Sequence, residues 1–220
     1  MTLHWIHLQN VPIVEQLQLE ETLLRTDNRN FCIVNKGSPR TIVMGISGKM
    51  EGLLNGELVQ RDNIPVIRRF SGGGTVIVDE ETLFITFIFS KGMVDVTPFP
   101  ESIMRWSADL YSAAWQIPGF SLLENDYIIQ DQKCGGNAQY IRKDRWLHHT
   151  SFLWDYKAEN MAYLQRPVKQ PKYRQDRGHL EFLCRLKDQG HASAADLLDR
   201  LKGELVKRFY IEELEWGGER

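Results

Sequence analysis

The sequence predicts an α+β fold in which a mixed, mostly antiparallel sheet is flanked by helices. Segments rich in β-branched and aromatic residues occur in runs, at 65–70, 75–79 and 83–89 and again at 120–123, 127–129, 133–141 and 146–154. Amphipathic helical spacing interrupts these runs at 103–114 and follows them at 195–205. Strand runs that are interrupted and followed by helices are typical of the α+β class.

The N-terminal part of the chain fits the same class. Residues 3–8 alternate as a short strand does, and apolar residues between positions 13 and 24 recur at helical spacing. We expect 31–34 and 41–44 to pair as short strands around a turn at 36–39. A short helix with a polar face is expected at about 51–60.

The bulk composition favours a single domain over residues 1–220, in which 166–220 form a basic loop and a helical C-terminal segment. The chain has 220 residues, of which 42% are hydrophobic and 25% charged, close to the globular average. A net charge of −2 argues against a nucleic-acid or membrane partner. Three scattered cysteines fit neither a disulfide framework nor a zinc site. We therefore expect a cytoplasmic protein, or a mitochondrial or plastid one if it is eukaryotic and processed.

The most informative segment reads Arg-Arg-Phe-Ser-Gly-Gly-Gly at 68–74, between two strand-like runs. Three glycines weaken a strand, and they are useful where a ligand must approach the backbone and accept its N–H groups. The arginines and the serine favour an anionic ligand such as a phosphate. A glycine-rich hairpin turn with two solvated arginines is the alternative. Asp79 ends the next strand and either holds Mg²⁺ beside the phosphates or caps a turn.

A second candidate segment begins at Lys133, which is followed by Cys-Gly-Gly-Asn-Ala on a predicted strand. A lysine in a fixed position can hold carboxylate and phosphate oxygens together. Neighbouring strand residues point to opposite faces, so we expect Cys134 to be a small packed residue on the other side. The same reasoning applies to His148 and His149, of which one is expected to line the pocket and neither to bind a metal.

Four ordered motifs resemble those of the lipoate–protein ligase A family. Residues 68–79 are similar to its Arg-Arg-x-Ser-Gly-Gly-Gly-x-Val-x-His-Asp signature, and 133–138 are similar to its Lys-x-x-Gly-Ser/Asn-Ala segment. Residues 125–126 match its Asn-Asp, and 147–149 its aromatic-His-His strand, while 16–24 are similar to its first helix. The match covers most of 10–155. The chain resembles the short, plant-type branch, which lacks the C-terminal accessory domain.

The resemblance implies a catalytic domain of the biotin/lipoate ligase type. Such an enzyme activates lipoate with ATP and Mg²⁺ to lipoyl-AMP and then acylates a lysine of an acceptor lipoyl domain. It implies a catalytic role for Lys133 and a Mg²⁺ site at Asp126 or Asp79. The binding residues expected are Arg69, Ser71, Gly72, Gly73, Gly74, Val76, Asn125, Asp126, Gly136, Asn137, Ala138 and His149. An apolar slot for the lipoyl chain is expected from Val76, Phe87 and Trp146.

The implied partners are an acidic lipoyl domain of a 2-oxoacid dehydrogenase complex, the H protein of glycine cleavage, and a separate accessory subunit. Residues 166–187 carry seven basic and two acidic side chains. Three roles are open for this charged run: a solvated loop, a segment that closes over the adenylate, or a docking site for the acceptor. Val78 replaces the family's histidine, and any role of that imidazole is absent.

Two other functions stay open at this point. One is an octanoyl or lipoyl transferase that uses a preformed acyl donor, which in its thioester form needs a cysteine facing Lys133. The other is a non-catalytic module that binds a lipoyl domain.

Overall fold

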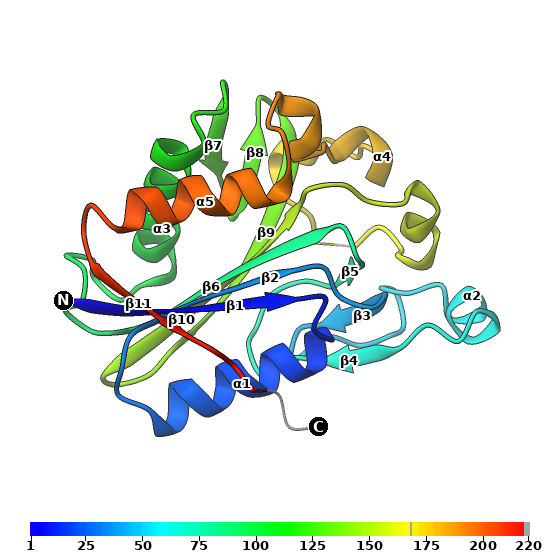
Figure 1. Cartoon of the computed structure of the whole chain (residues 1–220). Helices are drawn as coiled ribbons and strands as arrows, with labels where there is room; N and C mark the ends of the chain where they lie inside the picture. The colour runs from blue at the N-terminus through cyan, green and yellow to red at the C-terminus, as the bar shows by residue number, and fades with distance from the viewer. Residues whose placement is uncertain (168, 218–220) are drawn as a thin grey trace.

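The computed structural model describes residues 1–167 and 169–217, and it has the predicted α+β architecture (Figure 1). The larger sheet has eight strands in the order β11-β1-β2-β6-β10-β9-β8-β7. Their bounds are β11 (Tyr210–Leu214), β1 (Thr2–Gln9), β2 (Phe31–Lys36), β6 (Thr82–Ser90), β10 (Arg145–Leu153), β9 (Gln132–Ile141), β8 (Asp126–Ile129) and β7 (Phe120–Leu123). β1 runs parallel to both of its neighbours, β2 and β11, and every other pair of neighbouring strands in this sheet is antiparallel. The prediction of a mixed, mostly antiparallel sheet is confirmed.

A second sheet has three strands in the order β4-β3-β5, with bounds β4 (Val66–Arg68), β3 (Thr41–Met44) and β5 (Val76–Val78). The expected pairing of 31–34 with 41–44 is wrong, because β2 joins the larger sheet and β3 the smaller one. The reason is β3's position between β4 and β5, which use both of its edges. Since β4 and β5 do not pair with each other, the glycine-rich segment between them is not a hairpin turn.

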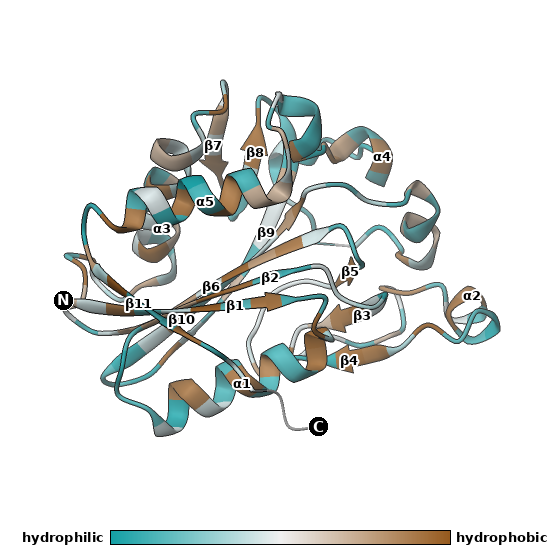
Figure 2. Ribbon diagram, viewed as in Figure 1, coloured by the Kyte–Doolittle hydropathy of each residue, from teal (hydrophilic) through white to brown (hydrophobic). Residues whose placement is uncertain are grey.

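Helices cover the two faces of the larger sheet differently. α3 (Pro100–Trp115) and α5 (Ala194–Leu205) lie on one face, and α1 (Ile13–Thr26) lies on the other, beside the smaller sheet (Figure 1). Figure 2 shows hydrophobic and hydrophilic residues alternating along α1 and α5, as expected of helices with one buried face. Among the described residues no helix is both long and apolar enough to cross a membrane.

The shorter helical elements are α2 (Gly56–Arg61), α4 (His179–Phe182), η1 (Ala158–Tyr163), η2 (Lys172–Arg174) and η3 (Leu186–Gln189). The prediction of a helical segment after the basic loop is too simple, because the chain returns from α5 to the larger sheet as β11. β11 lies parallel to β1, so the two ends of the described chain share one sheet edge (Figure 1).

The core beneath α3 and α5 explains one of the glycines that the sequence singled out. Gly135 on β9 lies against Phe152 of β10, and a Cβ at Gly135 would lie 2.5 Å from the Phe152 ring. Phe152 is fully buried and packs edge-on against Trp115 and Tyr111. Core packing by itself therefore requires a glycine at position 135.

Substituting Gly135 by alanine is expected to destabilise the fold by about 1–3 kcal/mol, because the new methyl group overlaps a ring that cannot move within a close-packed core. Gly203→Ala is the matched control, since a Cβ at Gly203 meets nothing within 4 Å and α5 continues through this position. The control is expected to be neutral or slightly stabilising. Urea unfolding of both variants measures the difference, and equal midpoints would contradict the assignment of Gly135.

Candidate active site

The structure has one large cavity among its described residues, with a volume of about 1010 Å³. Its walls are formed by the smaller sheet, by one face of β6, β9 and β10, by the start of α1, and by the segment that leads into and includes α4. Of the predicted site residues, the cavity is lined by Arg69, Gly72, Gly73, Gly74, Val76, Asn125, Asp126, Lys133, Gly136, Asn137, Ala138 and His149. The fold therefore gathers motifs that are up to 80 residues apart around a single space.

The glycine-rich segment 68–74 (the glycine loop) is a compact structure held by Arg69. The buried guanidinium donates from Nε and Nη2 to the Gly72 carbonyl at 3.0 and 2.7 Å, and from Nη2 to the Gly74 carbonyl at 2.8 Å. Burial lowers the pKa of Arg69 to about 10, and the side chain stays charged at neutral pH. Arg69 therefore shapes the loop by holding the Gly72 and Gly74 carbonyl oxygens, and we expect loop N–H groups to be available to an anion.

Gly73 is the glycine on which this arrangement depends. Its φ of +101° is one that residues with side chains rarely adopt, and a Cβ there would lie 2.6 Å from Arg69 Nη2. Gly45, which the sequence reading did not single out, has a similar role, because a Cβ there would lie 2.2 Å from the Gly73 carbonyl oxygen. The position of Gly45 directly after β3 is the sequence feature that could have indicated this role. Gly72 and Gly74 face open space.

Two predicted site residues lie outside the cavity lining. Ser71 is buried, and its carbonyl accepts a hydrogen bond from Ile46 N at 3.0 Å. Asp79 caps the β5–β6 turn: its Oδ1 accepts from Glu81 N at 3.1 Å and its Oδ2 from Asn160 Nδ2 at 2.8 Å. The alternative interpretation of Asp79 as a turn cap fits this geometry, and the structure gives no support for a Mg²⁺ ligand at this position.

Lys133 lies where the sequence predicts a fixed cation. Its Nζ is 2.7 Å from Asp126 Oδ1, and a Cβ on Gly136 would lie 3.3 Å from the same nitrogen. Gly136 therefore keeps the path of the lysine side chain clear along β9. Asp126 is the carboxylate that contacts Lys133, and Glu124, at the tight turn between β7 and β8, also lines the cavity.

No cysteine is among the described residues that line the cavity. Cys134 is buried in the core beneath α3, on the opposite face from Lys133 as predicted. Burial raises the pKa of the Cys134 and Cys32 thiols. These positions disfavour the thioester form of the transferase hypothesis, which needs a thiolate beside Lys133.

One end of the cavity is apolar, and it is built by Ile13, Leu17, Val43, Val78 and Phe84. Val78, which replaces the histidine of the motif, is buried in this cluster. The expectation that Phe87 and Trp146 line the slot is wrong: both belong to the core under α3. Successive residues of β6 and β10 point to opposite faces, so Phe84 and His149 reach the cavity while Phe87 and Trp146 do not.

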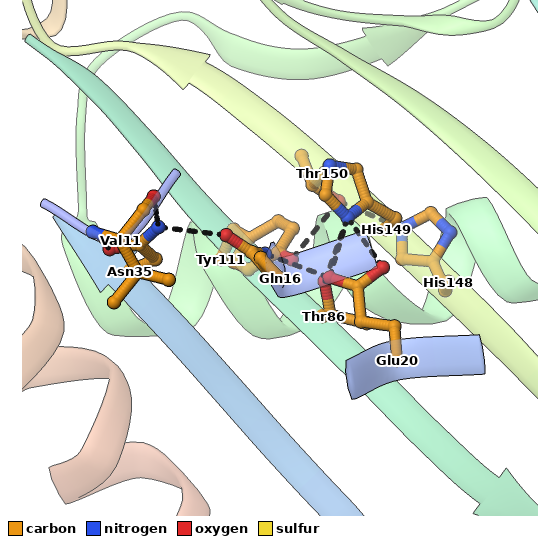
Figure 3. Close-up of polar contacts among 9 residues, drawn as sticks. All are labelled: Val11, Gln16, Glu20, Asn35, Thr86, Tyr111, His148, His149 and Thr150. Atoms are coloured by element: carbon orange, nitrogen blue, oxygen red, sulfur yellow. Dashed lines mark hydrogen bonds and ion pairs between the residues drawn. The ribbon is translucent and has the colours of Figure 1, made fainter. Parts of the chain in front are cut away.

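A buried polar network backs this apolar end (Figure 3). Glu20 of α1 accepts from Gln16 Nε2 and Thr86 Oγ1, both at 2.7 Å, and its Oε1 lies 2.9 Å from His149 Nδ1. Asn35 extends the network by donating to Gln16 Oε1 at 3.0 Å. Nδ1 of His149 is thus committed to Glu20, and Nε2 is the ring nitrogen left for a ligand.

The sequence reading assigned no role to Gln16 and Glu20. The signal was there, because both occupy the apolar face of α1 together with Ile13, Leu17 and Leu24. Two polar residues spaced by four on a buried helix face indicate a satisfied internal network.

His148 faces the opposite side of β10 and is fully buried (Figure 3). Its Nε2 is 2.8 Å from Tyr127 Oη, and its Nδ1 is 3.0 Å from Gln139 Nε2. Burial, with a smaller contribution from His149, lowers the pKa of His148 to about 3, and the ring is neutral at pH 7. The prediction that the two histidines serve different faces is confirmed.

This burial predicts a pH dependence of stability. Between pH 6.5 and about 3 the unfolded chain binds a proton at His148 that the folded protein does not, so the free energy of unfolding falls as pH falls. The slope from this group reaches about 1.4 kcal/mol per pH unit. Urea unfolding at pH 7, 5.5 and 4.5 measures it, and His148→Gln is expected to show a shallower decline. Parallel slopes for the two proteins would contradict the assignment.

Part of the cavity wall comes from the described residues of the basic segment 166–183. Arg174, which is buried, donates from Nε to the Arg177 carbonyl at 3.0 Å and lies over the Phe182 ring at 4.7 Å. Burial and the neighbouring Arg174 lower the pKa of His179. The described part of this segment is therefore packed against the cavity, which the sequence reading left open.

Comparison with known proteins shows the family of this chain. The model of the lipoyl protein ligase A/B catalytic domain matches residues 12–206, and the chain belongs to that family. A curated relative, the inactive lipoate–protein ligase 2 of Plasmodium falciparum, is 30% identical over 84% of this chain. The chain spans 63% of that relative and smaller shares of other curated relatives, such as 44% of a probable lipoate–protein ligase A of Mycoplasma genitalium.

Solved structures share the fold. A bipartite lipoate–protein ligase of Thermoplasma acidophilum, described together with its E2 lipoyl domain, superposes with a TM-score of 0.80 at 19% identity, covering 99% of this chain and 88% of that chain. A lipoate–protein ligase A bound with ATP gives 0.76 at 18% identity, covering 97% of this chain and 90% of that chain. The fold is therefore that of the lipoate–protein ligase catalytic domain.

Proposed function

We propose that this chain is an ATP-dependent lipoate–protein ligase. It would activate lipoate to lipoyl-AMP and transfer the lipoyl group to a lysine of an acceptor lipoyl domain. The observation that carries the proposal is the placement of Lys133, paired with Asp126, in the same cavity as the glycine loop and the apolar end. Family membership and the ATP-bound structural neighbour support it.

The cavity provides for each part of an acyl-adenylate. The apolar end around Leu17 and Phe84 suits a short acyl chain, and the glycine loop suits phosphate oxygens. Lys133 lines the same cavity, and there it would hold the carboxylate and the α-phosphate for in-line attack and offset their negative charge. A preorganised donor of this kind contributes roughly 3 kcal/mol to transition-state stabilisation.

Mg²⁺ would screen the triphosphate, and Asp126 or Glu124 are the cavity carboxylates placed to hold it. One oxygen of Asp126 already pairs with Lys133, so Asp126 would hold Mg²⁺ while it also keeps its contact with Lys133. Mg²⁺ sites of this kind use one or two carboxylates together with substrate phosphates, and the residues present fit that requirement.

The acceptor would be an acidic lipoyl domain, either of a 2-oxoacid dehydrogenase complex or the H protein of glycine cleavage. The Thermoplasma ligase and its E2 lipoyl domain support this class of partner. A separate accessory subunit is a further expectation, because that neighbour is described as bipartite.

A second candidate function follows from the name of the Plasmodium relative, which is called inactive. A chain that transfers lipoate only from preformed lipoyl-AMP would keep Lys133 and the acyl slot without the activation step. Exchange of labelled pyrophosphate into ATP, dependent on lipoate, separates the two. Exchange supports the full ligase, and transfer from synthetic lipoyl-AMP without exchange supports the transferase.

The test of the main proposal is mass spectrometry of an apo lipoyl domain incubated with this chain, Mg-ATP and lipoate, with octanoate as an alternative acyl donor. A lipoyl mass increment that requires ATP is the expected result. Absence of both lipoyl-AMP and modified acceptor, with accessory subunits supplied, would overturn it and favour a non-catalytic binding module.

A further inference from the structure

Tyr173, in the basic segment 166–183, contacts the candidate catalytic pair directly. Its hydroxyl donates to Asp126 Oδ2 at 2.8 Å, and its backbone N–H donates to Glu124 Oε1 at 3.2 Å. The Tyr173 ring packs against the buried Phe182 ring, with 5.2 Å between centroids. Tyr173 is thus seated by three separate contacts that come from two different parts of the fold.

Asp126 divides its two oxygens between the segment and the lysine. Oδ1 lies 2.7 Å from Lys133 Nζ, and Oδ2 accepts from Tyr173. The Tyr173 hydroxyl is the donor in this contact, because a carboxylate oxygen can only accept. The three side chains form a chain of contacts from segment 166–183 through Asp126 to Lys133.

We propose that Tyr173 is a positioning residue that sets the direction of Lys133 through Asp126. With Tyr173 in place, the carboxylate is held at both oxygens and can offer Lys133 a single orientation toward the cavity. Without the Tyr173 hydroxyl, one carboxylate oxygen loses its partner, Asp126 regains rotational freedom, and Lys133 loses that orientation. The alignment of the lysine is therefore coupled to the seating of Tyr173. The inference rests on the proposed ligase function for its kinetic consequence, but not for the contact itself.

The kinetic test uses Tyr173→Phe, which keeps the ring on Phe182 and removes only the hydroxyl. We expect kcat of lipoyl-adenylate formation to fall about tenfold or more, as for loss of a hydrogen bond to a charged group, with the KM values for ATP and lipoate within about twofold. Tyr210→Phe is the matched control, because Tyr210 is exposed on β11, away from the cavity.

A double-mutant cycle distinguishes positioning from a merely structural role. If Tyr173 acts through Asp126, Asp126→Asn combined with Tyr173→Phe is expected to be no slower than Asp126→Asn alone. Independent, multiplicative losses would overturn the proposal. So would a loss that appears in KM with kcat unchanged.

A second measurement does not depend on ligase activity. The rate at which an amine-reactive acylating reagent labels Lys133, followed by peptide mass spectrometry, is expected to rise several-fold in Tyr173→Phe, while labelling of the exposed Lys157 stays constant. Equal Lys133 labelling in the variant and the wild type would overturn the coupling. If labelling rises as expected but the wild-type chain forms no lipoyl-AMP, the contact stands and the proposed function fails.

Discussion

Lys133→Ala is expected to abolish lipoyl-adenylate formation, with a loss of at least about a thousandfold in kcat. The substitution removes the cation that would hold the carboxylate and the α-phosphate together, and the alanine that replaces it has neither a charge nor a hydrogen-bond donor in its side chain. It also leaves Asp126 Oδ1 without its partner at 2.7 Å, which adds a negative charge where the substrates are anionic. Single-turnover formation of radiolabelled lipoyl-AMP measures the effect.

The matched control is Lys157→Ala. Lys157 is exposed and paired with Glu80 at 2.8 Å, outside the cavity lining. Its removal is expected to leave kcat unchanged within about twofold, since surface ion pairs contribute little. Comparable activity of Lys133→Ala and the wild type, with both proteins folded, would contradict the catalytic role assigned to Lys133.

Gly73→Ala is expected to reduce activity about a hundredfold while the protein stays folded. The new methyl group would lie 2.6 Å from Arg69 Nη2, and the residue would have to keep a φ of +101°. The guanidinium must then move, and its bonds to the Gly72 and Gly74 carbonyls are lost. The loop would turn its N–H groups away from the phosphates, which removes several preorganised donors at once.

Two measurements check this prediction. Lipoyl-AMP formation reports the activity, and urea unfolding reports the cost to stability, expected at about 1–3 kcal/mol. Gly72→Ala serves as the stability control, because a Cβ at Gly72 meets nothing within 4 Å. Equal unfolding free energies for the two variants would show that the conformation of Gly73 is not the constraint described above.

The local patterns predicted most of the elements well. The strands from β6 to β10 and the helices α1, α3 and α5 lie where periodicity placed them. Alternation along a strand also separated Lys133 from Cys134 and His149 from His148 correctly, because successive side chains must point to opposite faces. These inferences depend on chain geometry within a few residues.

Pairing between distant segments could not be read in the same way. The position of β3 between β4 and β5 depends on which sheet edges are free after the core has formed, and the wrong partner was predicted for it. Phe87 and Trp146 were assigned to the acyl slot because they are apolar and lie near the motifs, but the face they occupy is decided by register. β11 was missed because an exposed, charged five-residue strand has no distinct pattern until an edge such as β1 is available.

The glycine-rich motif shows most clearly what each level determines. The sequence by itself determined that 68–74 form a glycine-rich connection between two strands, and that Lys133 must face away from Cys134, because both follow from local sterics. Only the tertiary structure decided that Arg69 holds the loop, that Glu20 commits His149, and that Tyr173 reaches Asp126. Arg69 closes a loop of three to five residues, whereas the contacts of Glu20 with His149 and of Tyr173 with Asp126 join segments 129 and 47 residues apart. Their formation is governed by burial and packing of the folded chain, which no local pattern encodes.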